Sequence, residues 1–168
     1  MLAALGVPDA LAHEVIGLLL ARGETVATAE SLTAGLVSAA LTCVPGSSAA
    51  VRGGLVVYAT ELKAELAGVS AGLLAEHGAV HPEVARQLAL GAATRCGASW
   101  GVGLTGVAGP DPQDGVAPGR VYLAIAGAAT VRGATVDLAG DRHAVRAGAV
   151  QAALRELRSA LTACSTDE

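Results

Sequence analysis

The motif AESLTAG, residues 29–35, places Ser31 directly before a helix predicted over 32–44. A serine in this position can cap the helix, because its hydroxyl satisfies a backbone amide that has no partner in the first turn. It can also act as a nucleophile, because the free N–H groups and the positive end of the helix dipole would stabilise an oxyanion beside it. Both interpretations stay open on this motif alone.

The motif YATELK brings a second pair of reactive types together, Tyr58 and Lys63. The tyrosine is predicted to end a strand and the lysine to lie one turn into the next helix, so both can point into one cleft. A lysine on a short helix is usually a solvated charge, but Lys63 is the only lysine in a chain that otherwise uses arginine. Chemistry that needs a deprotonatable amine cannot accept arginine, and this favours Lys63 as a base.

Other motifs argue against metal or cofactor chemistry. The stretch GVGLTG, residues 101–106, matches a dinucleotide-binding pattern, but its glycines lie within a predicted strand and no helix follows. The histidines are scattered, and Cys43, Cys96 and Cys164 have no metal-ligand spacing, so we expect neither a metal nor an organic cofactor. Unpaired cysteines and the lack of a basic leader with a cleavage site predict a cytoplasmic protein.

Composition excludes several further classes. With 52% hydrophobic and 15% charged residues the chain is not disordered. No apolar run reaches the roughly 18 residues of a membrane span, so we expect no membrane partner. The formal charge of −4 and the lack of a basic run make nucleic acid an unsuitable partner.

Length and hydrophobic periodicity predict a single α/β domain over 1–168. Helices are expected over 8–23, 32–44, 61–69, 71–78, 81–97 and 142–164, and strands over 24–29, 53–59, 99–106, 120–127 and 130–140. A long glycine- and proline-rich loop over 107–119 is typical of a functional segment. Alternating helices and strands followed by a hairpin predict a mixed, mostly parallel sheet that is covered on both faces.

Seven motifs in order resemble the CinA C-terminal domain family, over about residues 8–162. They are AESLTAG (29–35), VPGSS (44–48), GLVVYATELK (54–63), HGAV (77–80), TGVAGP (105–110), GRVYLAIA (119–126) and GDRHAVR (140–146). Members of this family with activity are nicotinamide-nucleotide amidohydrolases, which deamidate nicotinamide mononucleotide (NMN) in pyridine-nucleotide recycling. The resemblance implies a three-layer α/β/α sandwich, a homo-oligomer, and a serine nucleophile assisted by tyrosine and lysine, roles that fall on Ser31, Tyr58 and Lys63.

The implied mechanism begins with attack of Ser31 Oγ on the carboxamide carbonyl. Lys63 would accept the hydroxyl proton directly or through Tyr58, and the backbone amides around Leu32 and Thr33 would hold the oxyanion. Ammonia would leave, and water would release nicotinate mononucleotide from the acyl-enzyme.

This base must be a neutral amine, so the pKa of Lys63 has to fall from about 10.4 towards 7–8. Desolvation would lower it, and so would a neighbouring cation, for which Arg52 and Arg120 are candidates.

Further residues are candidates for binding the substrate. Thr105, Gly106 and Gly109 offer a hydroxyl and closely spaced amides to a phosphate. Arg142 and Arg146 lie one turn apart and share a helix face, although a solvated basic face is the alternative.

Glu30, Thr33 and Gly35, from the same motif as Ser31, complete the predicted binding set. Glu30 would orient Lys63 or a ribose hydroxyl, with a plain surface charge as the alternative.

The chain departs from the family pattern at four positions. Leu32 stands where a small residue or cysteine is common, Ala34 replaces a glycine, Thr60 replaces an asparagine, and Arg120 replaces a threonine. The extra methyl at position 34 would crowd the helix start, and the loss of asparagine would loosen the turn that aims Tyr58. Two alternatives to NMN deamidation therefore stay open: a Ser/Lys amidase acting on another amide, and a nucleotide-binding module without activity.

Overall fold

The computed structural model describes residues 9–127 and 130–163. Its helices are α1 (Asp9–Arg22), α2 (Leu36–Thr42), α3 (Thr60–Ala67), α4 (Ala71–His77), α5 (Pro82–Cys96) and α6 (Arg142–Ala163), with a short 3-10 helix η2 (Ser47–Ala49). Its strands are β1 (Val26–Glu30), β2 (Val51–Val56), β3 (Trp100–Gly106), β4 (Arg120–Ala126) and β5 (Val131–Asp137).

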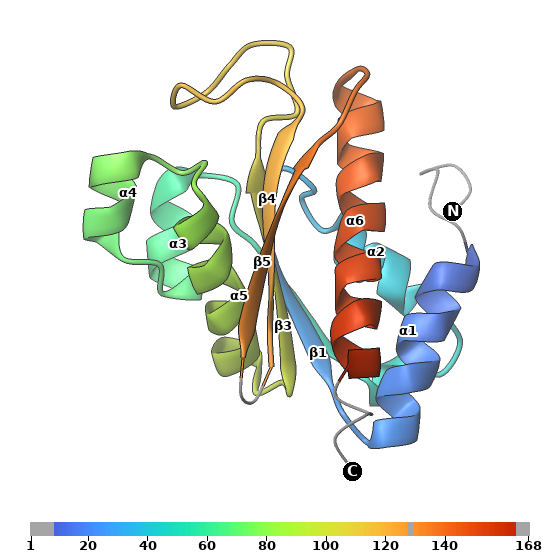
Figure 1. The fold of residues 1–168 in the computed structure, drawn as a ribbon. Coiled ribbons are helices and arrows are strands. Elements are labelled where there is room, and N and C mark those ends of the chain that lie inside the picture. The colour runs from blue at the N-terminus through green and yellow to red at the C-terminus, as the bar shows by residue number, and fades with distance from the viewer. Residues whose placement is uncertain (1–8, 128–129, 164–168) are drawn as a thin grey trace.

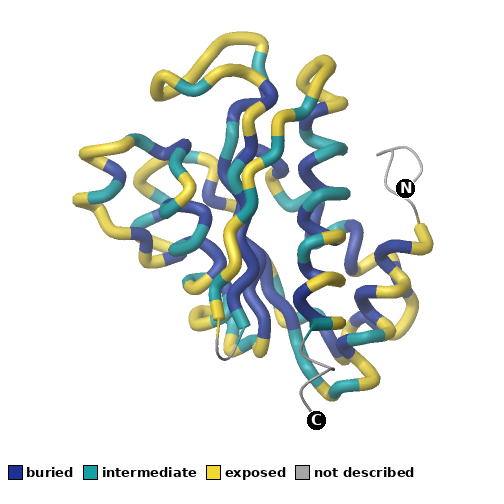
Figure 2. Tube along the Cα trace, viewed as in Figure 1, coloured by how far each residue is buried: buried dark blue, intermediate teal, exposed yellow. Residues whose placement is uncertain are grey.

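The helices cover both faces of one five-stranded sheet (Figure 1). Helices α1, α2 and α6 lie on one face and α3, α4 and α5 on the other. The apolar side chains between the sheet and each helical layer form separate clusters, and the larger cluster lies under α1, α2 and α6. Figure 2 shows the central strands buried between these layers, which confirms the three-layer α/β/α sandwich.

The strand order β2-β1-β3-β4-β5 makes the sheet mixed. Strands β2, β1 and β3 are parallel, β4 is antiparallel to β3, and β5 is antiparallel to β4. Four of the five strands therefore point the same way, as expected. The carboxyl ends of β1, β2 and β3 meet at one edge of the sheet, where ligand sites of open α/β sheets form.

Two glycines of β3 explain the stretch GVGLTG. A Cβ added at Gly101 would lie 1.9 Å from the Ala89 carbonyl oxygen, and one at Gly103 would lie 2.4 Å from the Ala85 carbonyl oxygen. Both acceptors belong to α5, so these glycines let the helix lie directly on the strand. The pattern is a packing feature of the fold, in agreement with its rejection as a dinucleotide site.

The start of α2 differs from the prediction. The helix begins at Leu36, whereas the sequence predicted a start at residue 32. Residues Ala34 and Gly35 have φ angles of 49° and 94°, which lie in the left-handed region and interrupt the helix before it starts. The other predicted elements are present with ends shifted by a few residues; the predicted helix ends at residue 8 and at Cys164 lie outside the described residues.

Among the described residues, no helix combines the length and the apolar character needed to cross a membrane.

Candidate active site

A pocket of about 310 Å³ lies at the edge where β1, β2 and β3 end. This volume is at the lower end of the roughly 300–1,000 Å³ of small-molecule sites. Its polar side chains are those of Ser31, Tyr58, Thr60, Thr105, Asp111, Gln113 and Arg142. They come from the end of β3, from the segments that follow β1, β2 and β3, and from the first residue of α6, so the sheet brings together parts of the chain that are far apart in sequence.

Ser31 follows the last residue of β1 and lines the pocket. Its backbone N–H donates to the Leu104 carbonyl oxygen at 3.1 Å, and its own carbonyl oxygen accepts from the Ala34 N–H at 3.0 Å. The residue is 8% exposed. Its main chain is therefore fixed on both sides, while its side chain belongs to the pocket wall.

The two amides that follow Ser31 are available to a ligand. Within the described part of the chain, neither the Leu32 N–H nor the Thr33 N–H has a hydrogen-bond acceptor. The carbonyl oxygens of the same two residues accept from Arg146, whose Nε is 2.9 Å from the Leu32 oxygen and whose Nη2 is 3.2 Å from the Thr33 oxygen. In a trans peptide the N–H points away from the carbonyl oxygen, so the bond to Leu32 turns the Thr33 N–H away from Arg146.

Glu30 caps α2 from inside the protein. Its Oε2 accepts from the N–H groups of Gly35 and Val37, both at 3.0 Å, and its Oε1 accepts from the Ser38 N–H at 2.9 Å and the Thr28 hydroxyl at 3.0 Å. The side chain is fully buried. Glu30 thus binds the N–H groups of Gly35, Val37 and Ser38, so the amides that remain beside Ser31 are those of Leu32 and Thr33, ahead of the helix.

Lys63 is buried beneath the connection between β2 and α3, with 1% of its surface exposed. Its Nζ donates to the carbonyl oxygens of Val57 at 2.8 Å and Tyr58 at 3.2 Å. A neutral amine has two N–H donors and one lone pair. The neutral form can therefore keep both hydrogen bonds and still offer a lone pair to a proton.

The surroundings of Lys63 favour this neutral form. Burial lowers the pKa of Lys63 to about 8, while the negative charges of Asp114 and Glu61 act in the opposite direction. The expected cationic neighbours are not found, because Arg52 and Arg120 form their contacts elsewhere. Desolvation alone is the cause of the lowered value.

Arg142 links Tyr58 to the long loop. Its Nη2 donates to the Tyr58 hydroxyl oxygen at 2.8 Å, and its Nη1 donates to the Gly109 carbonyl oxygen at 3.0 Å. Tyr58 is 57% exposed, so this contact fixes a hydroxyl that would otherwise move freely. The phenol can still donate its own proton to another group.

The opposite wall of the pocket is held by hydrogen bonds to Ala79. The Thr105 hydroxyl donates to the Ala79 carbonyl oxygen at 2.7 Å, and the Asp114 carboxylate accepts from the Ala79 N–H at 2.9 Å. Sequence reasoning missed Asp114 and the pocket residues Asp111 and Gln113. The signal that could have found them is an Asp-Gly turn pair in a long loop.

The sequence predictions divide into two groups in space. Six predicted residues line the pocket: Ser31, Tyr58, Thr105, Gly106, Gly109 and Arg142. The other five are Lys63, Glu30, Thr33, Gly35 and Arg146, and none of them is part of the pocket lining. Among the described residues no group of His, Cys, Asp or Glu is arranged to hold a metal ion.

Comparison with known proteins adds the family to this geometry. Residues 8–161 match the family model of the CinA C-terminal domain. The chain belongs to this family. A CinA-like protein of Frankia casuarinae is 45% identical over 97% of the chain, and one of Anaeromyxobacter sp. (strain K) is 48% identical over 91% of it. The chain spans only 38% of the length of these curated relatives.

Solved structures of the CinA superfamily have the same fold. A competence-damaged protein (CinA) superfamily protein of Klebsiella pneumoniae is 32% identical, with a TM-score of 0.89 over 92% of this chain and 98% of its own. The competence/damage inducible protein CihA of Agrobacterium tumefaciens is 36% identical, with a TM-score of 0.87 over 92% of this chain and 94% of its own.

The departures from the CinA pattern now have positions in space. Ala34, where the family commonly has glycine, adopts a left-handed φ of 49°, a conformation that is unfavourable for residues with a Cβ. Leu32 and Thr60 line the pocket directly. Arg120 forms an exposed ion pair with Asp137 at 2.8 Å.

Proposed function

We propose that this CinA-family chain hydrolyses the carboxamide of NMN to nicotinate mononucleotide and ammonia, in pyridine-nucleotide recycling. The observation that carries the proposal is the buried Lys63, whose pKa of about 8 makes it a usable base beside a pocket that contains Ser31 and Tyr58. The amine is buried, and none of the carboxylates in the described part of the chain is bonded to it, which is an unusual cost for a residue with only a structural role.

The first step forms a bond between Ser31 Oγ and the carboxamide carbon. The Lys63 lone pair accepts the serine proton, directly or through the Tyr58 hydroxyl that Arg142 orients. The carbonyl π electrons move onto the oxygen. The unpartnered N–H groups of Leu32 and Thr33, next to Ser31, are the donors we assign to this oxyanion.

The second half of the reaction returns the site to its starting state. Lys63 gives its proton to the amide nitrogen, which leaves as ammonia, and the serine ester remains. A water molecule, deprotonated by the same amine, attacks the ester carbon and displaces the Ser31 oxygen. The oxygen regains its proton from Lys63, and nicotinate mononucleotide departs.

The phosphate of NMN would bind where the pocket offers donors. Gly106 and Gly109 line it with backbone and no side chain, and Arg142 adds a guanidinium at its rim. We assign Glu30, Gly35 and Arg146 to positioning the Ser31 turn, because their polar groups bind other parts of the chain.

Ammonia release from NMN by the purified chain tests the proposal. We expect activity in the wild type and at least about a thousandfold loss of kcat/KM in Ser31→Ala and in Lys63→Arg. Nicotinamide and glutamine should be poor substrates, because they lack the phosphate.

Ser48→Ala is the matched control for the serine, since Ser48 is exposed and distant in sequence from the pocket residues. Far-UV circular dichroism of each variant would show whether the fold is intact. Binding of NMN without ammonia release would refute hydrolysis and support a binding module. Activity that survives both substitutions would refute the assigned site.

A further inference from the structure

The Asp114 carboxylate joins the long loop to the turn between α4 and α5. Its Oδ2 accepts from the Ala79 N–H at 2.9 Å. It follows Gln113, which lines the pocket and pairs with Val116 in an isolated antiparallel bridge. The loop thus forms a small hairpin whose tip is attached to the scaffold by one side chain.

The receiving turn is shaped for this carboxylate. A Cβ added at Gly78 would lie 2.5 Å from Asp114 Cγ and 2.6 Å from Oδ2, so only glycine leaves room for it. Asp114 itself has a φ of 51°, a left-handed conformation that Asp and Asn tolerate better than other residues with a side chain. Gly78 and Asp114 are therefore both adapted to the hydrogen bond between the Asp114 carboxylate and the Ala79 N–H.

The same contact involves the pocket wall, and its carboxylate also acts on the buried amine. Ala79 lines the pocket and accepts the Thr105 hydroxyl at 2.7 Å, so a shift of Ala79 would move that wall. The Asp114 carboxylate is also the stronger of the two negative charges that act on Lys63, the other being Glu61 of α3. Anchoring the loop therefore also brings a negative charge close to the amine.

We propose that Asp114 is a positioning residue of this site: its carboxylate latches the 107–119 loop onto the 78–79 turn, and the docked loop holds that negative charge where it acts on Lys63. The catalytic consequence rests on the proposed function, whereas the latch and the charge do not. While the loop is docked, the carboxylate favours the ammonium form of Lys63. Removal of that charge would let the amine give up its proton more readily.

Other titratable groups surround this contact and must be separated from it. Glu61 lies two residues before Lys63 in α3, and the 78–79 turn is bracketed by His77, at the end of α4, and His81, the residue before α5. The two imidazole rings stack with their centroids 4.6 Å apart. The variants are therefore compared with the wild type at the same pH values, so that both rings contribute equally to each comparison.

The single lysine of the sequence makes the charge directly measurable. In the full chain labelled with ¹³C-lysine, one Cε signal reports the titration of Lys63. We expect Asp114→Asn, which keeps an acceptor for Ala79 but removes the charge, to lower the titration midpoint by about one pH unit. Glu61→Gln should lower it too without touching the latch, and Glu14→Gln, an exposed change of the same charge on α1, should leave it in place.

Hydrogen exchange of the Ala79 amide measures the latch. We expect this amide to keep its protection in Asp114→Asn and Glu61→Gln, and to exchange at least about tenfold faster in Asp114→Gly, because a hydrogen bond to a carboxylate is lost. Glycine is used here because it adopts the φ of position 114 without strain.

An unchanged Cε midpoint in Asp114→Asn would overturn the charge half of the proposal, and full protection of Ala79 in Asp114→Gly would overturn the latch. Neither readout requires catalysis. If NMN is not hydrolysed but both effects appear, the proposed function fails and the latch stands. If NMN is hydrolysed and neither effect appears, the proposed function stands and the latch fails.

Discussion

At the scale of single residues, the site contains two buried side chains with opposite chemistry. Glu30 accepts three backbone N–H groups and one hydroxyl, so its lone pairs are engaged by the protein itself. Lys63 donates to two carbonyl oxygens, and no carboxylate of the described residues is bonded to it. The hydrogen bonds of Glu30 fix a turn, whereas those of Lys63 leave the lone pair of its neutral amine free to accept a proton. This difference is why we assign Glu30 to positioning and Lys63 to catalysis.

The lowered pKa of Lys63 predicts the pH dependence of the reaction. The base must be neutral, so kcat/KM for NMN should rise about tenfold per pH unit below pH 8 and level off above it. Initial rates of ammonia release over a pH series, at NMN concentrations below KM, would measure this profile. A rate that is constant from about pH 6 to 9 would contradict a lysine base.

The residue types were readable from the sequence, but their partners were not. The single lysine, the tyrosine before it and the serine directly before a predicted helix made Lys63, Tyr58 and Ser31 candidates without a structure. The capping role of Glu30 was hidden because its amide partners lie five to eight residues further along a turn of unknown shape. Asp114 was hidden for the same reason, since its contact depends on the path of a long loop.

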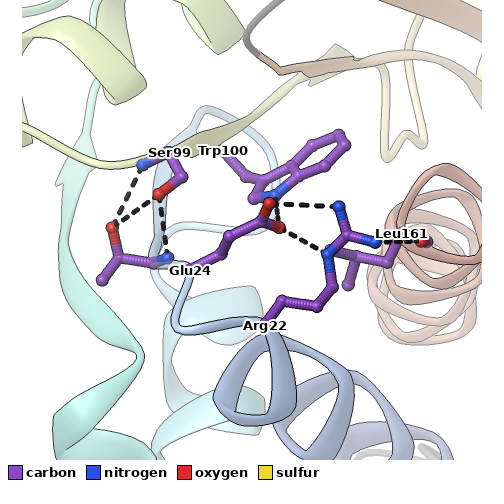
Figure 3. Close-up of polar contacts among 6 residues, drawn as sticks. Arg22, Glu24, Ser99, Trp100 and Leu161 are labelled. Atoms are coloured by element: carbon purple, nitrogen blue, oxygen red, sulfur yellow. Dashed lines mark hydrogen bonds and ion pairs between the residues drawn. The ribbon is translucent and has the colours of Figure 1, made fainter. Parts of the chain in front are cut away.

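At the scale of elements, a polar clamp holds the edge of the sheet opposite the pocket (Figure 3). Arg22, at the end of α1, binds both oxygens of Glu24 at 2.8 and 3.1 Å and donates to the Leu161 carbonyl oxygen of α6 at 3.1 Å. The Trp100 indole N–H, at the start of β3, donates to Glu24 at 2.6 Å. One carboxylate thus connects two helices and a strand.

This clamp predicts an acid-dependent loss of stability. The hydrogen bond from Arg22 lowers the pKa of Glu24, partial burial opposes this, and Trp100 lowers it further. Because the folded pKa lies below the unfolded value of about 4.3, the stabilisation is complete above that pH and is lost as the pH falls through the folded pKa. Glu24→Gln should therefore reduce the free energy of unfolding by about 1 kcal/mol at pH 7 and by less near pH 3.

Urea unfolding followed by the fluorescence of Trp100, the only tryptophan, would measure both values. Glu14→Gln is the matched control. Like Glu24, Glu14 forms an ion pair with an arginine, here Arg158 of α6, but its side chain is more exposed. We expect its effect to stay under about 0.5 kcal/mol. Equal losses in the two variants, or a loss in Glu24→Gln that persists at low pH, would contradict the clamp.

Element boundaries were predictable only where local conformation follows hydrophobic periodicity. The apolar spacing of 32–44 is helical throughout, yet α2 begins at Leu36 because Ala34 and Gly35 adopt left-handed φ angles. Glycine permits such angles but does not require them, and alanine gives no sign of them. The periodic parts of α1, α5 and α6 carry no such interruption, and their predicted spans agree with the structure.

At the scale of the whole molecule, the three layers depend on how closely α5 approaches the sheet. Gly101 and Gly103 of β3 leave no room for a side chain against the main chain of α5. The alternation of strands and helices predicted these layers, because each sheet face must be covered. The same alternation could not predict how close α5 lies to β3, because that distance is set by contacts between residues distant in sequence.

Substitution of these glycines should destabilise the fold. In Gly103→Ala the new Cβ would lie 2.4 Å from both the Ala85 oxygen and the Ala89 nitrogen, so α5 must move and the free energy of unfolding should fall by about 3 kcal/mol. Gly17→Ala is the matched control, since Gly17 lies within α1 with no atom within 4 Å of the added Cβ. Its higher helix propensity should raise stability by about 1 kcal/mol.

Urea unfolding of the two variants beside the wild type would give both differences. A Gly103→Ala protein as stable as the wild type would show that α5 can shift on the sheet without cost.

The burial of the only lysine also gives the chain an internal reporter of its own opening. A protease that cuts only after lysine has one target peptide bond, that between Lys63 and Ala64. The lysine that the protease must bind is 1% exposed. The folded chain should therefore resist such a protease until α3 detaches from the sheet. The rate of this single cut, giving 1–63 and 64–168, would then follow the population of molecules in which Lys63, the base we propose, is exposed to solvent.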